Sequence, residues 1–163
     1  MQRDDFLRAF EALGARLGPR TEIVVAGGSA LVLLGIVDRS TADADAVASH
    51  PKLSTFAREV AAVADDLDLA PTWVNDGVTA YRDLLPPDFA SRTVFLGTFD
   101  QLTVRVLGRE DLIIIKLAAS RPRDLDDLHA LAPTLPRINS LYPRDALRMQ
   151  LYLEQHGPTP ERS

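Results

Sequence analysis

The stretch from Glu22 to Val47 constrains the fold of this chain more than any other part of the sequence. It opens with a short apolar run, Ile23 to Ala26, breaks at Gly27-Gly28, and continues through Ser29 into a second apolar segment, Ala30 to Leu34. The first run predicts a strand and the second a helix, with the two glycines at the turn. A helix that starts there leaves free backbone N–H groups at its first turn, and these suit a phosphate. Gly27, Gly28 and the Ser29 hydroxyl are therefore candidate nucleotide-binding groups.

Two aspartates close this stretch. Asp43-Ala44-Asp45 runs into Ala46, Val47 and Ala48, which together predict a second strand. Because side chains at i and i+2 of a strand share a face, the two carboxylates are expected to project side by side. Neighbouring carboxylates repel unless a positive charge lies between them, and a divalent cation such as Mg²⁺ or Mn²⁺ meets that need best. The sequence thus predicts a metal site at Asp43 and Asp45.

This combination of motifs resembles a known superfamily. Gly28-Ser29, a gap of about a dozen residues, and then Asp43-x-Asp45 is similar to the nucleotidyltransferases that include DNA polymerase beta. The pattern also resembles the bacterial AbiEii-like branch and related small nucleotidyltransferase-fold proteins of unassigned function, in which a GGSAL-type turn precedes a T-x-D-x-D strand. Leu107 to Leu131 fits that branch too, with a lysine on a helix and an R-x-x-D-x-x-D run after it. The resemblance spans residues 20–132.

The resemblance implies a fold and a reaction. The implied fold is α/β, with a mixed sheet of about four or five strands flanked by helices and followed by C-terminal helices. The implied activity is transfer of a nucleoside monophosphate from an NTP to an acceptor, with Mg²⁺ or Mn²⁺ at the two aspartates and the terminal phosphates at Gly28 and Ser29. In the related toxins the acceptor is a tRNA end or a protein hydroxyl, so a cognate antitoxin is an implied partner.

One departure from the superfamily pattern leaves alternatives open. Polymerase-like members carry a third carboxylate on a neighbouring strand. The two predicted strands at 91–99 and 102–107 contain no acidic residue. The alternative is a catalytically inactive module of the same fold that binds a nucleotide or a partner protein. A third interpretation is an unrelated α/β domain whose motifs coincide by chance.

Three cations are candidates for the nucleotide. Lys116 lies in the apolar helix predicted for Leu112 to Ala119, where its ammonium either extends to water at the helix edge or enters the cleft and meets a triphosphate. The resemblance favours the second interpretation. Arg39, in the polar connector before Asp43, neutralises phosphate or is a solvated loop residue. Arg121 precedes the next predicted helix and is the third candidate.

A second pair of aspartates is predicted on the helix from Asp124 to Leu131. Asp124 and Asp127 are three residues apart and share one helical face, while Leu125, Leu128 and Leu131 are expected to line the buried face. Asp124 as a helix cap and Asp127 as a solvent-facing residue is the plainer interpretation. The resemblance favours a catalytic role for both, as substitutes for the missing strand carboxylate.

The other elements follow from apolar periodicity and turn residues. Trp73 is expected in the core rather than as a base-stacking residue, and Asp65, Asp66 and Asp68 at a solvated helix end rather than at a second metal site. The remaining predicted elements are helices at 4–17, from Pro51 to Ala64, at 79–85 and after Pro143, and an antiparallel hairpin of strands 91–99 and 102–107.

Composition bounds the class of protein. A net charge of −5 argues against a surface that grips nucleic acid throughout, and the absence of cysteine excludes disulfides and thiolate metal sites. The three histidines are too scattered for a zinc pattern. No apolar run reaches the length of a membrane span and no signal-peptide region is present, so a cytoplasmic protein without a membrane partner is the default expectation. Residues 1–157 are expected to form one domain, with a disordered tail at 158–163.

Overall fold

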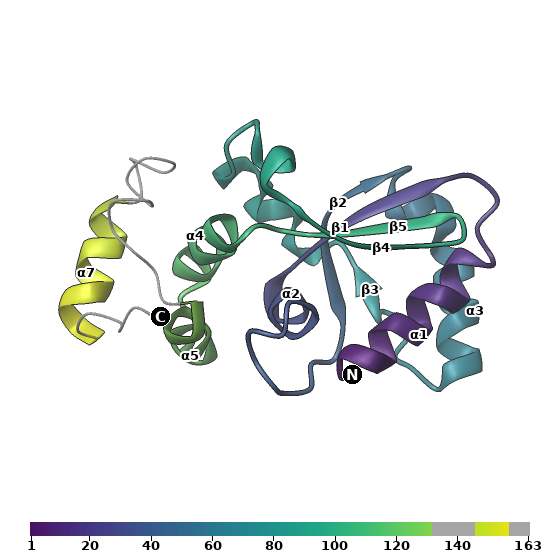
Figure 1. Ribbon diagram of the computed structural model, residues 1–163, viewed down its shortest axis with the longest axis horizontal. Helices are drawn as coiled ribbons and strands as arrows, with labels where there is room; N and C mark the ends of the chain where they lie inside the picture. Colours follow the sequence, from purple (N-terminus) through teal and green to yellow (C-terminus); the bar gives the residue numbers. More distant parts are fainter. Residues whose placement is uncertain (132–145, 157–163) are drawn as a thin grey trace.

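The fold is built on one mixed β-sheet with helices on its faces and at one end (Figure 1). The computed structural model describes residues 1–131 and 146–156. The predicted tail at 158–163 lies outside the described residues. The single domain proposed for 1–157 stays a prediction.

The sheet has five strands in the order β3-β2-β1-β5-β4. β1 is antiparallel to β2 and parallel to β5, β3 is parallel to β2, and β4 and β5 form the predicted hairpin. The predicted mixed sheet of four or five strands is confirmed. The strands are β1 (Thr21–Ala26), β2 (Ala44–His50), β3 (Val74–Asn75), β4 (Val94–Phe99) and β5 (Leu102–Val106).

The helices agree with the predicted segments except at their ends. The first helix stops at Gly14 rather than near Leu17, because the backbone tightens there and the N–H of Arg16 donates to the carbonyl of Leu13. The segment predicted as a helix from Pro51 begins as a 3₁₀ turn, and the one near Thr79 is 3₁₀ throughout. The α-helices are α1 (Arg3–Gly14), α2 (Gly27–Leu33), α3 (Ala57–Leu67), α4 (Arg109–Ala119), α5 (Pro122–Leu131) and α7 (Ala146–His156), and the 3₁₀ helices are η1 (Leu53–Phe56), η2 (Gly77–Leu84) and η3 (Phe89–Arg92).

An aromatic cluster joins α1 to the sheet and to α3. The Phe10 ring lies about 6 Å from the rings of Phe6, Trp73 and Phe99. Trp73 is fully buried, and its indole N–H donates to the carbonyl of Val60 in α3. The prediction that Trp73 is a core residue is therefore confirmed.

The acidic end of α3 is a surface feature. Asp66 pairs with Arg16 beyond the end of α1, and Asp68 ends α3 in the left-handed conformation. All three acids of this helix end are exposed. This agrees with the prediction of a solvated helix end.

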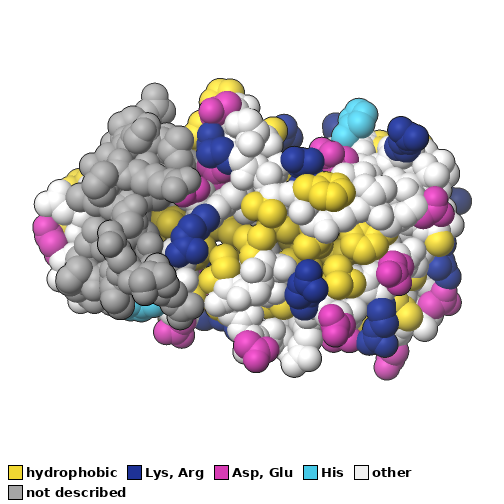
Figure 2. Space-filling model, viewed as in Figure 1, with side chains coloured by type: hydrophobic (Ala, Val, Ile, Leu, Met, Phe, Trp, Pro, Cys, Tyr) yellow, Lys and Arg dark blue, Asp and Glu magenta, His cyan; other side chains and the backbone are white. Residues whose placement is uncertain are grey.

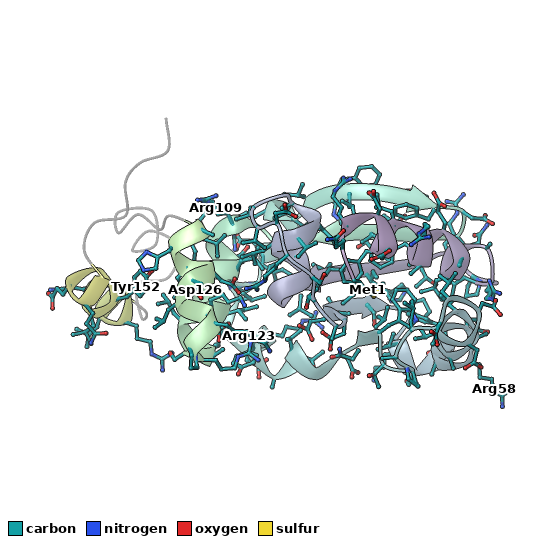
Figure 3. The ribbon with its side chains drawn as sticks, turned by 90° about the horizontal axis from the view of Figure 1, so that it is seen from below. Met1, Arg58, Arg109, Arg123, Asp126 and Tyr152 are labelled. Carbon is teal, nitrogen blue, oxygen red and sulfur yellow. The ribbon has the colours of Figure 1, made fainter. Side chains whose placement is uncertain are left out.

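The helices divide the molecule into two regions. α1 and α3 pack on the sheet, while α4, α5 and α7 gather beyond its other end, with α2 between the two groups (Figures 1 and 3). Apolar side chains gather in the middle of the face in Figure 2, with charged side chains around them. On the edge strand β4, Val94 and Phe95 are 45% and 56% exposed. None of the helices in the described ranges has both the length and the apolar character needed to cross a membrane.

One predicted core position is wrong. Leu125 in α5 is 37% exposed, whereas Asp124 and Asp127 are 0% and 1% exposed and share the buried face with Leu128 and Leu131. The helix is rotated from the expected orientation because two buried carboxylates find cationic partners inside the protein. Asp127 facing solvent, the plainer interpretation of that residue, is excluded by the same burial.

Candidate active site

A polar pocket of about 220 Å³ lies where the β1–α2 turn meets the start of β2 and helices α4 and α5. Six of the ten predicted site residues line it, and four cations are among the lining groups. No apolar side chain contributes to this lining. The lining residues are Gly28, Arg39, Ser40, Thr41, Asp43, Asp45, Lys116, Arg121 and Arg123.

Asp43 and Asp45 occupy the sheet side of this pocket. β2 runs antiparallel to β1, and Asp45 is paired with Ala26, the last residue before the glycine turn. The two carboxylates therefore lie next to that turn, as their i, i+2 spacing predicts. Both side chains are half-buried, and both open into the pocket.

The electrostatic setting of Asp45 favours a cation. Burial raises the pKa of the Asp45 carboxyl, the charge of Asp43 raises it further, and the hydrogen bond with Asn75 acts the other way. The charges of Arg121 and Lys116 lower this pKa, but burial and Asp43 outweigh them, so the ionised pair needs more positive charge. A cation bound between the two carboxylates would supply it.

Gly27 permits the close approach of the turn to β2. Its φ is +66°, a left-handed value that non-glycine residues rarely adopt, and a Cβ at this position would lie 2.3 Å from Asp45 Oδ2. The residue does not line the pocket. Its contribution is to let the Asp45 carboxylate pack directly against the backbone.

The hydroxyl of Ser29 is directed into the protein instead of into the pocket. Ser29 is fully buried, and its Oγ donates to the carbonyl of Ala26 at 3.0 Å and accepts the backbone N–H of Asp45 at 3.4 Å. The side chain thus ties the first turn of α2 to β2. Of the predicted turn residues Gly27, Gly28 and Ser29, the structure brings Gly28 to the pocket wall.

A buried ion-pair network forms the helical side of the pocket. Lys116 Nζ lies 2.8 Å from Asp124 Oδ1 and 2.6 Å from Asp127 Oδ2, and all three side chains are at most 3% exposed. Lys116 lines the pocket, but two carboxylates hold its ammonium there, so it does not extend to bulk water. Its contact with a triphosphate stays a prediction.

Two arginines complete this network. Asp124 also accepts the backbone N–H and the Nε–H of Arg121, each at 2.9 Å, and Arg39 Nη2 lies 2.8 Å from Asp127 Oδ1. Burial raises the pKa of the Asp124 carboxyl, but the hydrogen bonds from Arg121 and Lys116 outweigh it and hold that pKa below its ordinary value. Cations therefore neutralise Asp124 and Asp127, although Asp127 Oδ1 lies within ion-pair distance of Arg39 without accepting a hydrogen bond.

The residues present fit a divalent cation held by two carboxylates. Within the described ranges, no three Asp, Glu or His side chains come together as a ready-made metal site. Mg²⁺ is commonly held by one or two carboxylates together with the phosphates of its substrate, and it keeps several waters. Asp43 and Asp45, repelling each other at the edge of a polar pocket, match that donor set.

Four residues at the site were missed from the sequence. Ser40, Thr41 and Arg123 line the pocket, and the Asn75 side chain donates to Asp43 Oδ2 at 2.9 Å. Arg123 lies on α5, at the side of that helix turned toward the sheet (Figure 3). Its position two residues after Arg121, a predicted site residue, was the sequence signal that could have identified it. No sequence signal pointed to Asn75, because β3 is only two residues long.

The sheet order and the glycine turn beside paired aspartates define a nucleotidyltransferase-like protein. A family model described as "Nucleotidyltransferase of unknown function (DUF6036)" matches residues 5–135, most of the chain. The chain belongs to this family, which confirms the predicted nucleotidyltransferase and leaves its AbiEii-like branch a prediction. Searches of curated proteins and of solved structures found no match.

Proposed function

We propose that this protein transfers a nucleoside monophosphate from an NTP to an acceptor hydroxyl and uses Mg²⁺ or Mn²⁺ held by Asp43 and Asp45. The observation that carries the proposal is the pocket that both carboxylates share with Gly28 and four cations. In the reaction, the acceptor hydroxyl gives its proton to solvent and its oxygen forms a bond to the α-phosphorus. The bond between the α-phosphorus and the oxygen that bridges it to the β-phosphorus breaks, and pyrophosphate leaves with that oxygen. The metal, when bound, neutralises charge on the phosphates and helps to align the reacting oxygens.

The polyphosphate is proposed to lie against the helical side of the pocket. Arg39, Arg121 and Arg123 supply guanidinium groups, which suit phosphate oxygens in geometry and charge. Arg123 has no ion-pair partner among the described residues, so no described carboxylate competes with a phosphate for its guanidinium group. Lys116 contributes mainly through the network, because two carboxylates already neutralise its ammonium.

The charges of the site link nucleotide binding to metal binding. Four cations line the pocket, and the four aspartates in and behind it match them in number. A polyphosphate therefore meets little net attraction until a divalent cation adds positive charge. Nucleotide and metal are expected to strengthen each other's binding.

Asp124 and Asp127 are proposed to position Lys116, Arg39 and Arg121. This role replaces the catalytic role suggested by the resemblance, because both carboxylates are already paired with these cations. An RNA or protein acceptor, a toxin–antitoxin pair and a bacterial cytoplasmic setting remain predictions from the sequence. A second candidate function is nucleotide or partner binding without catalysis, which is favoured by a neutral amide, Asn75, on the strand next to Asp45.

The test is metal-dependent transfer of label from each of the four α-labelled NTPs to RNA and to protein acceptors. Asp45→Asn is expected to lower transfer at least about a hundredfold, because one of two metal-binding carboxylates is neutralised. Asp65→Asn, at the exposed end of α3, is the matched control. Transfer by Asp45→Asn at the wild-type rate would remove the paired aspartates from the mechanism. Metal-dependent nucleotide binding without any transfer would favour the second candidate.

A further inference from the structure

Asn75 lies beside the paired aspartates although it is 30 residues away from Asp45 in the sequence. β3 runs parallel to β2, and Asn75 is paired with Asp45 in this register. The strand next to the two carboxylates therefore presents an amide. Asn75, Asp76 and Gly77 together have the composition of a turn.

Two hydrogen bonds fix the orientation of this amide. The backbone N–H of Gly77 donates to Asn75 Oδ1 at 2.9 Å, and Asn75 Nδ2 donates to Asp43 Oδ2 at the same distance. If the amide were flipped, its NH₂ would face the N–H of Gly77 and its oxygen would face a carboxylate. Because both contacts would then be repulsive, the Gly77 N–H keeps the NH₂ group turned toward Asp43.

Asn75 is close to both aspartates. Its Nδ2 donates to Asp43 Oδ2, and its position on β3 is paired with Asp45 on β2. A neutral donor at this place orients a carboxylate without adding a charge that would repel a metal ion. The amide thus holds the pair oriented before a cation arrives.

We propose that Asn75 is a positioning residue of the metal site, which holds Asp43 beside Asp45 through a side-chain amide fixed by Gly77. The proposal rests on the proposed function, since it requires that the two aspartates bind a divalent cation. Partners of metal-binding groups that act in this way change metal affinity about 10-fold to 100-fold when they are removed. A residue that only forms a turn would change stability and leave metal affinity unaltered.

The experiment measures Mn²⁺ binding to the purified protein by electron paramagnetic resonance, together with the melting temperature without metal. Asn75→Ala is expected to raise the dissociation constant for Mn²⁺ about tenfold. Asp76→Ala is the control, because Asp76 belongs to the same turn, is exposed, and makes no side-chain hydrogen bond to cap η2. An unchanged dissociation constant in Asn75→Ala, with Mn²⁺ binding intact in the wild type, would overturn the role of Asn75 and leave the proposed function standing.

Asn75→Asp provides a second, independent measurement. The substitution keeps an acceptor for the Gly77 N–H but replaces the donor to Asp43 by a third carboxylate. Without metal, its melting temperature is expected to fall below that of the wild type, and Mn²⁺ is expected to raise it by more than in the wild type. A metal-free melting temperature equal to the wild-type value would show that the amide does not face Asp43, and would overturn the proposal. Absence of Mn²⁺ binding in the wild type would refute both this proposal and the proposed function.

Discussion

The two pairs of aspartates in this protein have opposite surroundings. Asp43 and Asp45, at the start of β2, are half-buried and open into a pocket. Burial and the charge of Asp43 raise the pKa of Asp45. Asp124 and Asp127, on α5, are almost fully buried and form ion pairs with one lysine and two arginines. Spacing placed each pair on one face of its element, and the resemblance made both pairs candidate catalytic residues.

The comparison shows that cationic partners decide what a carboxylate pair can do. A pair already neutralised by the protein gains little from a metal and mainly holds its partners in place. A pair whose neighbouring cations do not offset burial and mutual repulsion gains more from a bound metal. Asp43 and Asp45, the sheet pair, therefore suit metal binding. Asp124 and Asp127, the helix pair, suit the positioning of their cationic partners, although all four residues are aspartates.

The largest difference between the two pairs is expected in stability. Lys116→Met keeps most of the side-chain volume but leaves Asp124 and Asp127 buried without their shared ammonium, so we expect a loss of about 3–5 kcal/mol in the free energy of unfolding. Asp45→Asn is the comparison on the sheet side, and it should leave stability unchanged or slightly higher. Urea denaturation measures both. A loss below about 1 kcal/mol for Lys116→Met would mean that the helix pair is as tolerant as the sheet pair.

A smaller effect is expected from Gly27→Ala, which tests the geometry of the sheet pair. The left-handed φ costs about 1–2 kcal/mol for a non-glycine residue, and the added Cβ would push the Asp45 carboxylate away from the turn. Gly35→Ala is a matched control, because its φ is +68° and a Cβ there has open space around it. Both variants should lose similar stability in urea, whereas only Gly27→Ala should weaken Mn²⁺ binding. Equal Mn²⁺ affinity in the two variants would separate the turn from the metal site.

On the helical side, Arg123 tests whether the available charge binds the nucleotide. Arg123→Ala is expected to weaken binding of an NTP with Mg²⁺ about tenfold, the loss of one charged hydrogen bond in the pocket. Arg58→Ala, at the far end of the molecule on α3, is the control (Figure 3). Isothermal titration calorimetry measures both. Equal affinity in the two variants would place the polyphosphate away from α5.

The part of the site formed by residues close together in the sequence could be predicted. Alternation at the start of β2 places Asp45 and the preceding Asp43 on one face, and the glycines that open α2 predict the turn beside them. Both inferences need only the backbone geometry of a few consecutive residues. The prediction for Ser29 failed to anticipate its direction, because the buried carbonyl of Ala26 and the N–H of Asp45 engage its hydroxyl.

The contacts between residues far apart in the sequence could not be predicted. The network on α5 joins Arg39 to Asp127, 88 positions apart, and helical periodicity treats such aspartates as solvent-facing. The same limit placed Leu125 in the core, since the partners that turn α5 are not adjacent in sequence. β3 carries Asn75 to the paired aspartates in only two residues, which is too short for a strand pattern.

The smallest expected effect is a pH dependence of opposite sign for Asp45 and Asp124. The pKa of Asp45 is raised, so its ionisation costs stability as pH rises from the ordinary carboxyl range through the raised value. The pKa of Asp124 is lowered, so its stabilisation is present above the ordinary range and is lost as pH falls through the lowered value. Relative to the wild type, Asp45→Asn should therefore gain stability as pH rises, while Asp124→Asn should lose stability. Melting temperatures from about pH 3 to 7 span the ordinary carboxyl pKa and test both signs. Parallel curves for the two variants would show that the surroundings of the two carboxylate pairs do not shift their pKa values in opposite directions.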